Sequence, residues 1–316
     1  MAKSFWKRRR NDFLYILIAA LFYLVRLVPR KVGLPLFAFL GWIVSLFPTR
    51  DKKRMYTHLH FIYGETWSTT KIQKMITRIY VTLGKNMFDA LYFAYCSVSK
   101  FNTIVEYEGI KTIIEENCKG QGFVTIGGHI GCFEMPVHMF ANNGVKSVTI
   151  GQQLYDPRVD KLIQHFRSGN NAKEIVYLHR DGAGRSLIKY LRKGYGLGIL
   201  LDQDTKIEGV FARFLGKLAY TPDGPVRIAM KFKFPLYCVA VARQKNNKHT
   251  AQFKKIELEN TGDFDRDLVF NVQKVNDFLS DAIRKNPEQW VWMHRRWNRK
   301  PIQPQYKDVP NIEKYE

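Results

Sequence analysis

Short apolar runs alternate with stretches of helical periodicity through most of the chain after residue 120. Runs of five to seven mainly apolar residues predict strands at 121–127, 146–151, 174–178, 197–202 and 235–241. Amphipathic stretches between them predict helices near 131–143, 156–167, 184–193 and 222–232, and a strand at 250–259 and a long helix at about 265–285 follow. Apolar strands separated by helices are typical of a parallel sheet covered on both faces. We therefore expect an α/β fold with a mainly parallel, mixed sheet flanked by helices.

The first 54 residues have a different pattern, in which basic clusters bound two apolar runs. The runs are FLYILIAALFYLV (13–25) and VGLPLFAFLGWIVSLF (32–47), with KSFWKRRR before the first and RDKKR after the second. Neither reaches the roughly 18 to 20 uninterrupted apolar residues of a membrane span, although Arg26 could extend its charge to the interface and let the first run cross. Basic segments stay in the cytoplasm, so a re-entrant or interfacial arrangement fits the charges better. A buried helical hairpin of a soluble domain is the alternative.

These patterns divide the chain into three parts. We expect an N-terminal membrane-associated segment (1–50), an α/β domain (51–305) that begins with amphipathic helices, and a polar C-terminal tail (306–316). No small-residue cleavage site follows the first apolar run, so we expect the N-terminal segment to be retained.

The charge of the chain points to an anionic partner. Fifty Lys and Arg residues against 28 Asp and Glu residues give a formal net charge of +22. Phospholipid headgroups, nucleic acid, an acidic protein or a phosphorylated substrate would each suit this charge. The four cysteines lack the spacing of a zinc site or a disulfide scaffold, which favours a reducing compartment.

A break between a predicted strand and a predicted helix carries the strongest chemical signal. The segment GFVTIGGHIGCFEM (122–135) turns on glycines between His129 and Glu134. Five residues of regular helix rotate a side chain by about 500°, so these two side chains can converge only if the turn lies between them. Gly128 and Gly131 let the backbone bend and let a ligand approach closely.

A base beside an anion site describes acyl transfer to a hydroxyl group. His129 would take the acceptor proton, and Glu134 would fix the tautomer of His129 and stabilise the imidazolium. Free N–H groups at the start of the helix would stabilise the oxyanion. Two alternatives stay open: His129 merely caps the helix with Glu134 on its surface, or Cys132 acts as a nucleophile beside His129.

Two acidic and two basic residues near the ends of elements are further candidates. Asp202 and Asp204 follow a predicted strand in LLDQDTK, where ligands gather in open α/β sheets. The acidic pair could bind a cation or position a substrate hydroxyl, or it could form a turn and cap a helix. Arg167 and Arg180 have the forked guanidinium that suits phosphate, and a solvated surface position is the alternative for each.

The segment PEQWVWMHRRWNRKP (287–301) mixes indoles with cations. Its candidate interface residues are Trp290, Trp292, Arg295, Arg296 and Trp297. This mixture could stack on bases, or it could lie at a membrane interface with indoles at headgroup depth and arginines at phosphates. Because an apolar N-terminus precedes it, we favour the membrane interface.

Taken together, these residues resemble the lipid A biosynthesis acyltransferase family, the bacterial lauroyl and myristoyl transferases of the H-x4-D/E acyltransferase superfamily. The matching segments are GGHIGCFEM, the block from LDQDTK to CVAV (201–241) and PEQWVWMHRRWNRKP, in the family's order. The resemblance implies a glycerolipid-acyltransferase-like fold with an apolar helical N-terminal membrane-attachment segment.

The resemblance also implies roles for these residues. His129 and Glu134 are the implied catalytic pair, and Arg167 would bind the phosphorylated acceptor or donor. The candidate substrate-binding residues are Gly128, Gly131, Arg167, Arg180, Asp202 and Asp204. The implied reaction moves a fatty acyl chain from acyl carrier protein, or alternatively coenzyme A, to a hydroxyl of a Kdo-bearing lipid A precursor. It would take place at the cytoplasmic face of the bacterial inner membrane, with no metal and no cofactor beyond the donor's pantetheine arm.

Three other hypotheses compete with this one. An enzyme on the same fold could acylate another glycolipid or a lysophospholipid. A membrane-tethered, nucleic-acid-binding protein would use the positive charge but would leave the His129 and Glu134 turn without a task, so we expect no nucleic-acid partner. A catalytically silent relative that scaffolds lipid enzymes is weakened by the intact His129 and Glu134.

Overall fold

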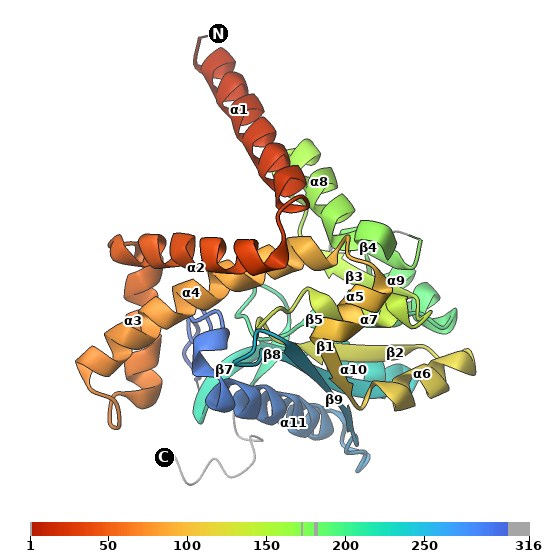
Figure 1. Cartoon of the computed structure of the whole chain (residues 1–316). Helices are drawn as coiled ribbons and strands as arrows, with labels where there is room; N and C mark the ends of the chain where they lie inside the picture. The colour runs from red at the N-terminus through yellow and green to blue at the C-terminus, as the bar shows by residue number, and fades with distance from the viewer. Residues whose placement is uncertain (1, 172, 180–182, 303–316) are drawn as a thin grey trace.

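Helices occupy the first hundred residues and an α/β unit occupies most of the rest (Figure 1). The computed structural model describes residues 2–171, 173–179 and 183–302, so Arg180 and the predicted tail 306–316 lie outside the described residues. The N-terminal helices are α1 (Ala2–Val25), α2 (Arg30–Leu46), α3 (Arg50–Tyr63), α4 (Thr69–Phe93) and α5 (Val98–Ile104). Helix α1 projects away from the body, whereas α2 lies along α4 (Figure 1).

A mixed sheet forms the centre of the α/β unit. Its strands are β1 (Val105–Glu108), β2 (Phe123–Gly127), β3 (Ser147–Gly151), β4 (Ile175–His179), β5 (Gly196–Leu200), β8 (Leu236–Arg243) and β9 (His249–Ile256). Within the described residues they form one sheet in the order β1-β9-β8-β2-β5-β3-β4. Every neighbouring pair is parallel except β8 and β9. The mainly parallel, mixed sheet predicted from the sequence is therefore confirmed.

Both faces of this sheet are covered, because successive residues of each central strand enter different cores. The flanking helices are α6 (Ile110–Cys118), α7 (Met135–Asn142), α8 (Pro157–Ser168), α9 (Ala183–Arg192), α10 (Gly224–Phe232) and α11 (Phe264–Lys285). On β2, Val124 and Ile126 join a core with α10 and α11, whereas Phe123 joins a second core with α6 and α7. Leu236 and Tyr237 divide in the same way on β8. This two-sided burial explains the continuous apolar runs in the sequence.

Some elements were not predicted from the sequence. Strands β6 (Gly209–Phe214) and β7 (Lys217–Pro222) form a separate antiparallel hairpin. Its turn residues, Leu215 and Gly216, both have positive φ values, of 54° and 88°, as tight hairpin turns require. Strand β1 and helix α6 were also missed, because their short segments carry weak periodicity.

Helix α2 packs tightly on α4 with one face and exposes the other. A Cβ atom at Gly41 would lie 2.3 Å from the Tyr80 carbonyl oxygen, and one at Gly84 would lie 2.1 Å from that of Phe37. Only glycine permits this approach of the two helices. The outward face of α2 carries large exposed apolar residues, namely Val32, Leu36, Phe39, Leu40, Trp42, Val44 and Leu46.

Helix α1 also exposes apolar side chains, and together with α2 it forms what we call the N-terminal apolar surface. Its exposed members on and just after α1 are Phe13, Leu14, Ile16, Leu17, Leu21, Leu24 and Leu27. No single helix in the described part of the chain has the length and apolar character of a membrane span. Helices α2 and α3 taken together have both, although the chain bends by 87° between them.

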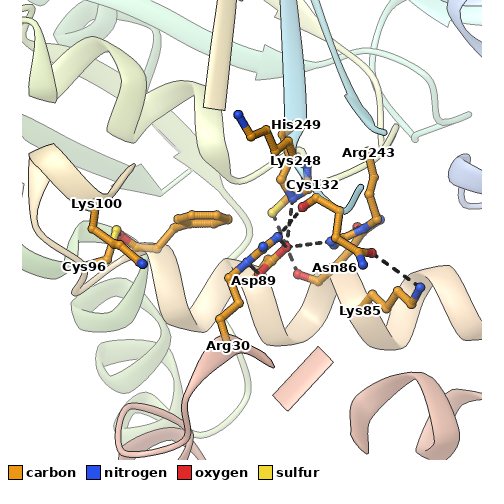
Figure 2. Close-up of polar contacts among 12 residues, drawn as sticks. Arg30, Lys85, Asn86, Asp89, Cys96, Lys100, Cys132, Arg243, Lys248 and His249 are labelled. Atoms are coloured by element: carbon orange, nitrogen blue, oxygen red, sulfur yellow. Dashed lines mark hydrogen bonds and ion pairs between the residues drawn. The ribbon is translucent and has the colours of Figure 1, made fainter. Parts of the chain in front are cut away.

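A buried carboxylate on α4 ties the N-terminal helices to the sheet (Figure 2). Asp89 is fully buried and accepts hydrogen bonds from Arg30 at 2.8 and 2.9 Å, from Arg243 at 2.8 Å and from His249 at 2.8 Å. Arg30 begins α2, Arg243 ends β8 and His249 begins β9. Burial raises the pKa of Asp89, but the hydrogen bonds from His249 and Arg30 and the charge of Arg243 outweigh it and hold the pKa at about 2.

The tryptophan and arginine segment lies mainly inside the protein, so the predicted membrane interface is wrong for most of it. Trp290, Trp292 and Arg296 have no exposed surface, Trp297 is half-buried, and Arg295 is exposed. The indoles join the core that lies beneath β2 and β5. Burying such large rings in a packed core is strongly favourable, and the sequence pattern alone does not distinguish this core from a membrane interface.

Arg296 can be buried because its two terminal guanidinium nitrogens donate to backbone and side-chain oxygens, whereas its Nε atom has no hydrogen-bond partner among the described residues. It donates to the Tyr220 carbonyl oxygen at 2.6 Å and to the Thr221 hydroxyl at 2.8 Å, and it lies 4.3 Å from the Phe214 ring centre. Burial lowers the pKa of Arg296 to about 10, against the opposing charges of Asp202 and Asp204. The side chain therefore stays charged at neutral pH.

We expect Asp89→Asn to lower the free energy of unfolding by about 3 to 5 kcal/mol, because Arg30 and Arg243 lose their counter-charge and His249 loses its carboxylate acceptor. Urea denaturation at pH 7 measures this change. The matched control is Asp281→Asn, which removes an exposed carboxylate paired with Arg284 and should change stability by less than about 0.5 kcal/mol. Equal losses in the two variants would contradict the bracing role of Asp89.

The stabilisation by Asp89 should also depend on pH. The ordinary pKa is 3.8 and the folded value is about 2, so this contribution is complete above about pH 4 and is lost as the pH falls toward 2. Between pH 5 and pH 3 the wild type should lose about 1 kcal/mol more stability than Asp89→Asn does. Parallel pH curves for the two proteins would show that another group carries the effect.

A neighbouring pair of arginines tests the burial of the C-terminal segment. We expect Arg296→Ala to cost about 3 kcal/mol of unfolding free energy, because buried oxygens lose their donors. Arg295→Ala, at an exposed position, should stay within about 0.5 kcal/mol of the wild type. Thermal and urea unfolding of both variants would measure this, and a small effect at Arg296 would argue for a surface position.

Candidate active site

The register of two parallel strands brings His129 and Asp202 together. Gly127 at the end of β2 pairs with Leu200 at the end of β5, and the Leu201 N–H group donates to the Gly127 carbonyl oxygen at 3.0 Å. His129 and Asp202 each follow this pair by two residues. Because parallel strands end at the same edge, residues 73 positions apart in the sequence become neighbours at the carboxyl edge of the sheet.

Asp202 is fully buried, and its carboxylate accepts three hydrogen bonds. The donors are the backbone N–H and Nδ1 of His129 and Nε1 of Trp290, each at 2.7 Å. Burial acts to raise the pKa of Asp202. The charge and hydrogen bond of His129, followed by His294 and Trp290, outweigh burial and hold the pKa below its usual range. Asp202 is therefore ionised at neutral pH.

An ionised Asp202 can only accept hydrogen bonds, and this settles the tautomer of His129. In the neutral imidazole the proton therefore lies on Nδ1, and Nε2 carries the lone pair. The amide nitrogen of Gln203 lies 3.1 Å from Nε2, where it can donate to that lone pair. The His129 side chain keeps 17% of its surface exposed, so a reactant can reach it.

Gln203 links His129 to a second histidine, His294, and neither Gln203 nor His294 was predicted from the sequence. The same amide nitrogen lies 2.9 Å from His294 Nε2, and the two histidine ring centres are 4.5 Å apart. Burial, with the nearby charge of His129, lowers the pKa of His294 to about 4, so this side chain is neutral near pH 7. The two hydrogens of one amide can thus point to the Nε2 atoms of both imidazoles. A lone glutamine or histidine gives no periodic signal, and only the flanking acidic and tryptophan motifs marked these positions.

Glu134 does not orient His129, which corrects the sequence prediction. Asp202 holds Nδ1 of His129, while Oε1 of Glu134 accepts from Nε and Nη2 of Arg167 at 3.0 and 2.7 Å. Among the described residues Glu134 forms no hydrogen bond with His129. The turn does lie between the two residues, as expected, but sheet register places a carboxylate of the neighbouring strand directly at the ring.

Arg167 and Glu134 form a partly exposed ion pair beside the turn. Arg167 lies in the last turn of α8, and Glu134 stands at the start of α7. Burial disfavours the charged guanidinium, but the charges of Glu134 and Tyr177 raise the pKa of Arg167 overall. The Arg167 side chain is 40% exposed, and its Nη1 group forms no hydrogen bond within the described residues. The predicted contact with phosphate stays a prediction.

The two candidate glycines are required by close packing around the site. A Cβ atom at Gly128 would lie 3.1 Å from Oδ2 of Asp202. Gly131 has φ +58°, and a Cβ atom there would lie 2.0 Å from the Val241 carbonyl oxygen. The groups that approach these glycines belong to the protein itself, and contact with a substrate stays a prediction.

Some of the N–H groups after β2 remain available. Those of Ile130 and Gly131 donate to backbone oxygens at 2.7 and 2.8 Å. Those of Cys132, Phe133 and Glu134 form no hydrogen bond in the part of the chain that the structure describes. They precede α7, where the helix dipole favours negative charge.

The remaining candidates separate from the site or change their role. Asp204 accepts from the backbone N–H of Arg299 at 2.9 Å and pairs with its guanidinium, so Asp202 and Asp204 have different partners and do not form a cation site together. Cys132 is buried, and burial raises the pKa of its thiol, which disfavours the thiolate that a nucleophile needs. Arg180 lies outside the described residues.

Known proteins similar to this chain are acyltransferases of lipid A biosynthesis. The family described as bacterial lipid A biosynthesis acyltransferase matches residues 3–299. The chain is 22% identical over 284 residues to the lipid A biosynthesis lauroyltransferase of Escherichia coli (strain K12), covering 88% of this chain and 89% of that protein. It is 20% identical over 240 residues to the lipid A biosynthesis palmitoleoyltransferase of the same organism, covering 74% and 75%. Because the match extends over the N-terminal helices and the α/β unit, the chain belongs to the bacterial lipid A biosynthesis acyltransferase family and is an O-acyltransferase.

Proposed function

We propose that this enzyme transfers a fatty acyl chain from an acyl carrier protein thioester to a hydroxyl group of a Kdo-bearing lipid A precursor. The observation that carries the proposal is the bond between buried, ionised Asp202 and Nδ1 of His129, which leaves Nε2 as a base at the edge of the sheet. The family supports acyl transfer, and the names of the relatives support a lipid A precursor as acceptor.

In the proposed reaction His129 acts first as a base and then as an acid. The acceptor hydroxyl oxygen attacks the thioester carbonyl carbon while Nε2 takes the hydroxyl proton, and Asp202 stabilises the imidazolium. The free N–H groups of Phe133 and Glu134 are the candidates to stabilise the tetrahedral oxyanion. When the carbon–sulfur bond breaks, the imidazolium returns its proton to the departing thiolate.

Gln203 occupies the position that the acceptor hydroxyl must reach. One lone pair on Nε2 of His129 cannot accept from the amide and the hydroxyl together, so the amide must withdraw when the acceptor binds. His294 remains as a neutral acceptor for that amide at 2.9 Å. Gln203 and His294 would thus act as positioning residues that fill the site between turnovers.

The Glu134 and Arg167 pair would recognise the acceptor rather than perform the proton transfer. Glu134 holds the guanidinium through Nε and Nη2, and Nη1 points to no partner within the described residues. A guanidinium held in this way can present its remaining donors to a phosphate group of the acceptor.

The N-terminal apolar surface would attach the enzyme to the bacterial inner membrane, with the α/β unit on the cytoplasmic face. Large apolar side chains exposed along two neighbouring helices are typical of a lipid or protein contact. The formal charge of +22 would attract the anionic bilayer, the phosphorylated acceptor and an acidic donor protein. Of the two membrane contacts predicted from the sequence, this proposal keeps the N-terminal segment and drops most of the tryptophan segment, which is buried.

We expect His129→Ala to lower the rate of acyl transfer by about 10²- to 10⁴-fold, because the hydroxyl loses its base. The assay supplies washed membranes containing the protein with radiolabelled acyl carrier protein thioesters of several lengths and Kdo-bearing lipid A precursor. His60→Ala, at an exposed position on α3, is the matched control and should keep full activity. Equal activity in the His129 variant would remove His129 as the base.

The same assay tests the proposed acceptor. If the wild type, shown to be folded and membrane-bound, acylates only a different glycolipid or a lysophospholipid, the Kdo-bearing acceptor is wrong while the role of His129 can still be measured. Lipid analysis of a deletion strain gives an independent answer, because loss of a lipid A acyltransferase lowers the acyl count of lipid A.

Comparison of two carboxylates separates their roles. Asp202→Asn should lower kcat by about 10²- to 10⁴-fold, because an amide no longer holds the His129 tautomer or stabilises the imidazolium. Glu134→Gln should raise KM for the phosphorylated acceptor more than it lowers kcat, since it only loosens Arg167. The reverse result would make Glu134 the partner of His129. Trp290→Phe removes one donor but keeps the Asp202 carboxylate, so a much smaller loss in this variant would show that the charge of Asp202 is what matters.

A further inference from the structure

A cavity lies where the end of α1 meets the end of α4 and the start of α5. Its volume is about 560 Å³, and its walls include Arg26, Lys100 and the tyrosines Tyr23, Tyr92 and Tyr95. None of these residues belongs to the candidate active site. The volume is within the range of small-ligand sites in proteins.

The cavity carries positive charge that the protein does not balance. Neither Arg26 nor Lys100 has a carboxylate partner among the residues that the structure describes. The Arg26 guanidinium carbon lies 4.0 Å from the centre of the Tyr95 ring, which fixes the cation at the wall. Lys100 lies beside Cys96, to one side of Asp89 and its hydrogen-bond partners (Figure 2). The nearby Asp89 carboxylate already bonds to two arginines and a histidine, so it does not neutralise the cavity.

The rim of the cavity is apolar and continuous with the N-terminal apolar surface. Leu27 follows Arg26 directly and is 79% exposed, and Val98 beside the cavity at the start of α5 is also exposed. Tyrosines and cations next to exposed apolar side chains are the combination found at the headgroup level of a bilayer. A site for a small soluble anion has no need of such a rim.

We propose that this cavity binds the phosphate group of an anionic phospholipid of the surrounding bilayer. Arg26 and Lys100 pair with the phosphate, the hydroxyl groups of Tyr23 and Tyr92 donate to its oxygens, and Leu27 enters the acyl region beside it. This inference rests on the membrane attachment proposed above and goes beyond acyl transfer. Phosphate binding in the cavity would fix how deeply the N-terminal apolar surface enters the bilayer and would favour bilayers that contain anionic lipid.

Vesicle flotation of the full-length purified protein tests the proposal. The probes are phosphatidylcholine vesicles with and without phosphatidylglycerol, and the test variant is Arg26→Gln combined with Lys100→Gln. We expect the variant to bind phosphatidylglycerol-containing vesicles on the order of tenfold more weakly than the wild type, because two charges leave the bilayer surface. Both proteins should bind pure phosphatidylcholine equally, since the apolar surface is unchanged.

A matched control separates a built site from diffuse charge. Lys111→Gln combined with Lys119→Gln removes the same charge from exposed positions at α6. This control should bind phosphatidylglycerol-containing vesicles within about twofold of the wild type. Equal losses in the two double variants would overturn the proposal in favour of diffuse attraction to the whole basic protein.

Two further measurements distinguish other sources of phosphate. Soluble glycerol phosphate should displace wild-type protein from phosphatidylglycerol-containing vesicles more than sodium chloride of equal ionic strength does, and should show no such excess for Arg26→Gln with Lys100→Gln. Tight binding of glycerol phosphate without any vesicle preference would assign the cavity to a soluble metabolite and overturn the lipid proposal.

Acyl transfer in detergent micelles keeps this result independent of the proposed reaction. The cavity variant should retain wild-type kcat and wild-type KM for the acceptor, which also shows that it is folded. A raised KM for the acceptor with an unchanged vesicle preference would assign the cavity to the acceptor and overturn the bilayer proposal. If no acyl transfer is found in any protein, the proposed reaction fails, and flotation still decides the lipid site.

Discussion

A single buried carboxylate holds the site together, because two distant parts of the chain donate hydrogen bonds to it. Asp202 follows β5, and its donors are His129 after β2 and Trp290 near the end of the described chain. An isolated charge with no exposed surface would be very costly, and these three hydrogen bonds and the histidine make it tolerable. The dependence is mutual, since the same carboxylate gives His129 its tautomer. The pairing of β2 with β5, the burial of Trp290 and the orientation of His129 therefore all depend on the hydrogen bonds to Asp202.

A second buried carboxylate performs the equivalent task for the N-terminal helices, and the structure connects the two. Asp89 binds Arg243, whose backbone N–H and carbonyl oxygen bond to the Gln289 side chain at 2.7 and 2.8 Å. The backbone carbonyl oxygen of Gln289 accepts from the Gly131 N–H group at 2.8 Å, and the indole N–H of the next residue, Trp290, donates to Asp202. The proposed membrane-attached helices and the turn that carries His129 are thus connected through hydrogen bonds and the covalent links between them. Attachment at α1 and α2 would place the base at a set position relative to the bilayer.

The sheet and most of its helices could be predicted from the sequence, because two-sided burial leaves continuous apolar runs such as 235–241. His129 and Asp202 were recognised as candidates by their positions at strand ends, but their partnership depends on β5 pairing directly with β2. Strand order is a long-range property that local patterns do not contain. The membrane interface predicted for the tryptophan segment was wrong for a related reason, because indoles and arginines suit a packed core and a membrane interface alike. Burial of Arg296 depends on oxygens that Tyr220 and Thr221 supply from a hairpin distant in the sequence.

His129 and Glu134, five residues apart, therefore do not form a hydrogen-bonded pair and have different partners. A sharp turn from strand to helix can carry both side chains, yet the nearest carboxylate to a base at the end of a parallel strand comes from the neighbouring strand, whose end lies at the same edge. This leaves Glu134 free to hold Arg167 at the start of the next helix. The spacing of five residues satisfies two requirements. His129 reaches Asp202 on the neighbouring strand, and Glu134 reaches Arg167 on α8. A motif that is compact in sequence can thus contribute to two separate sites, for which we propose proton transfer and anion recognition.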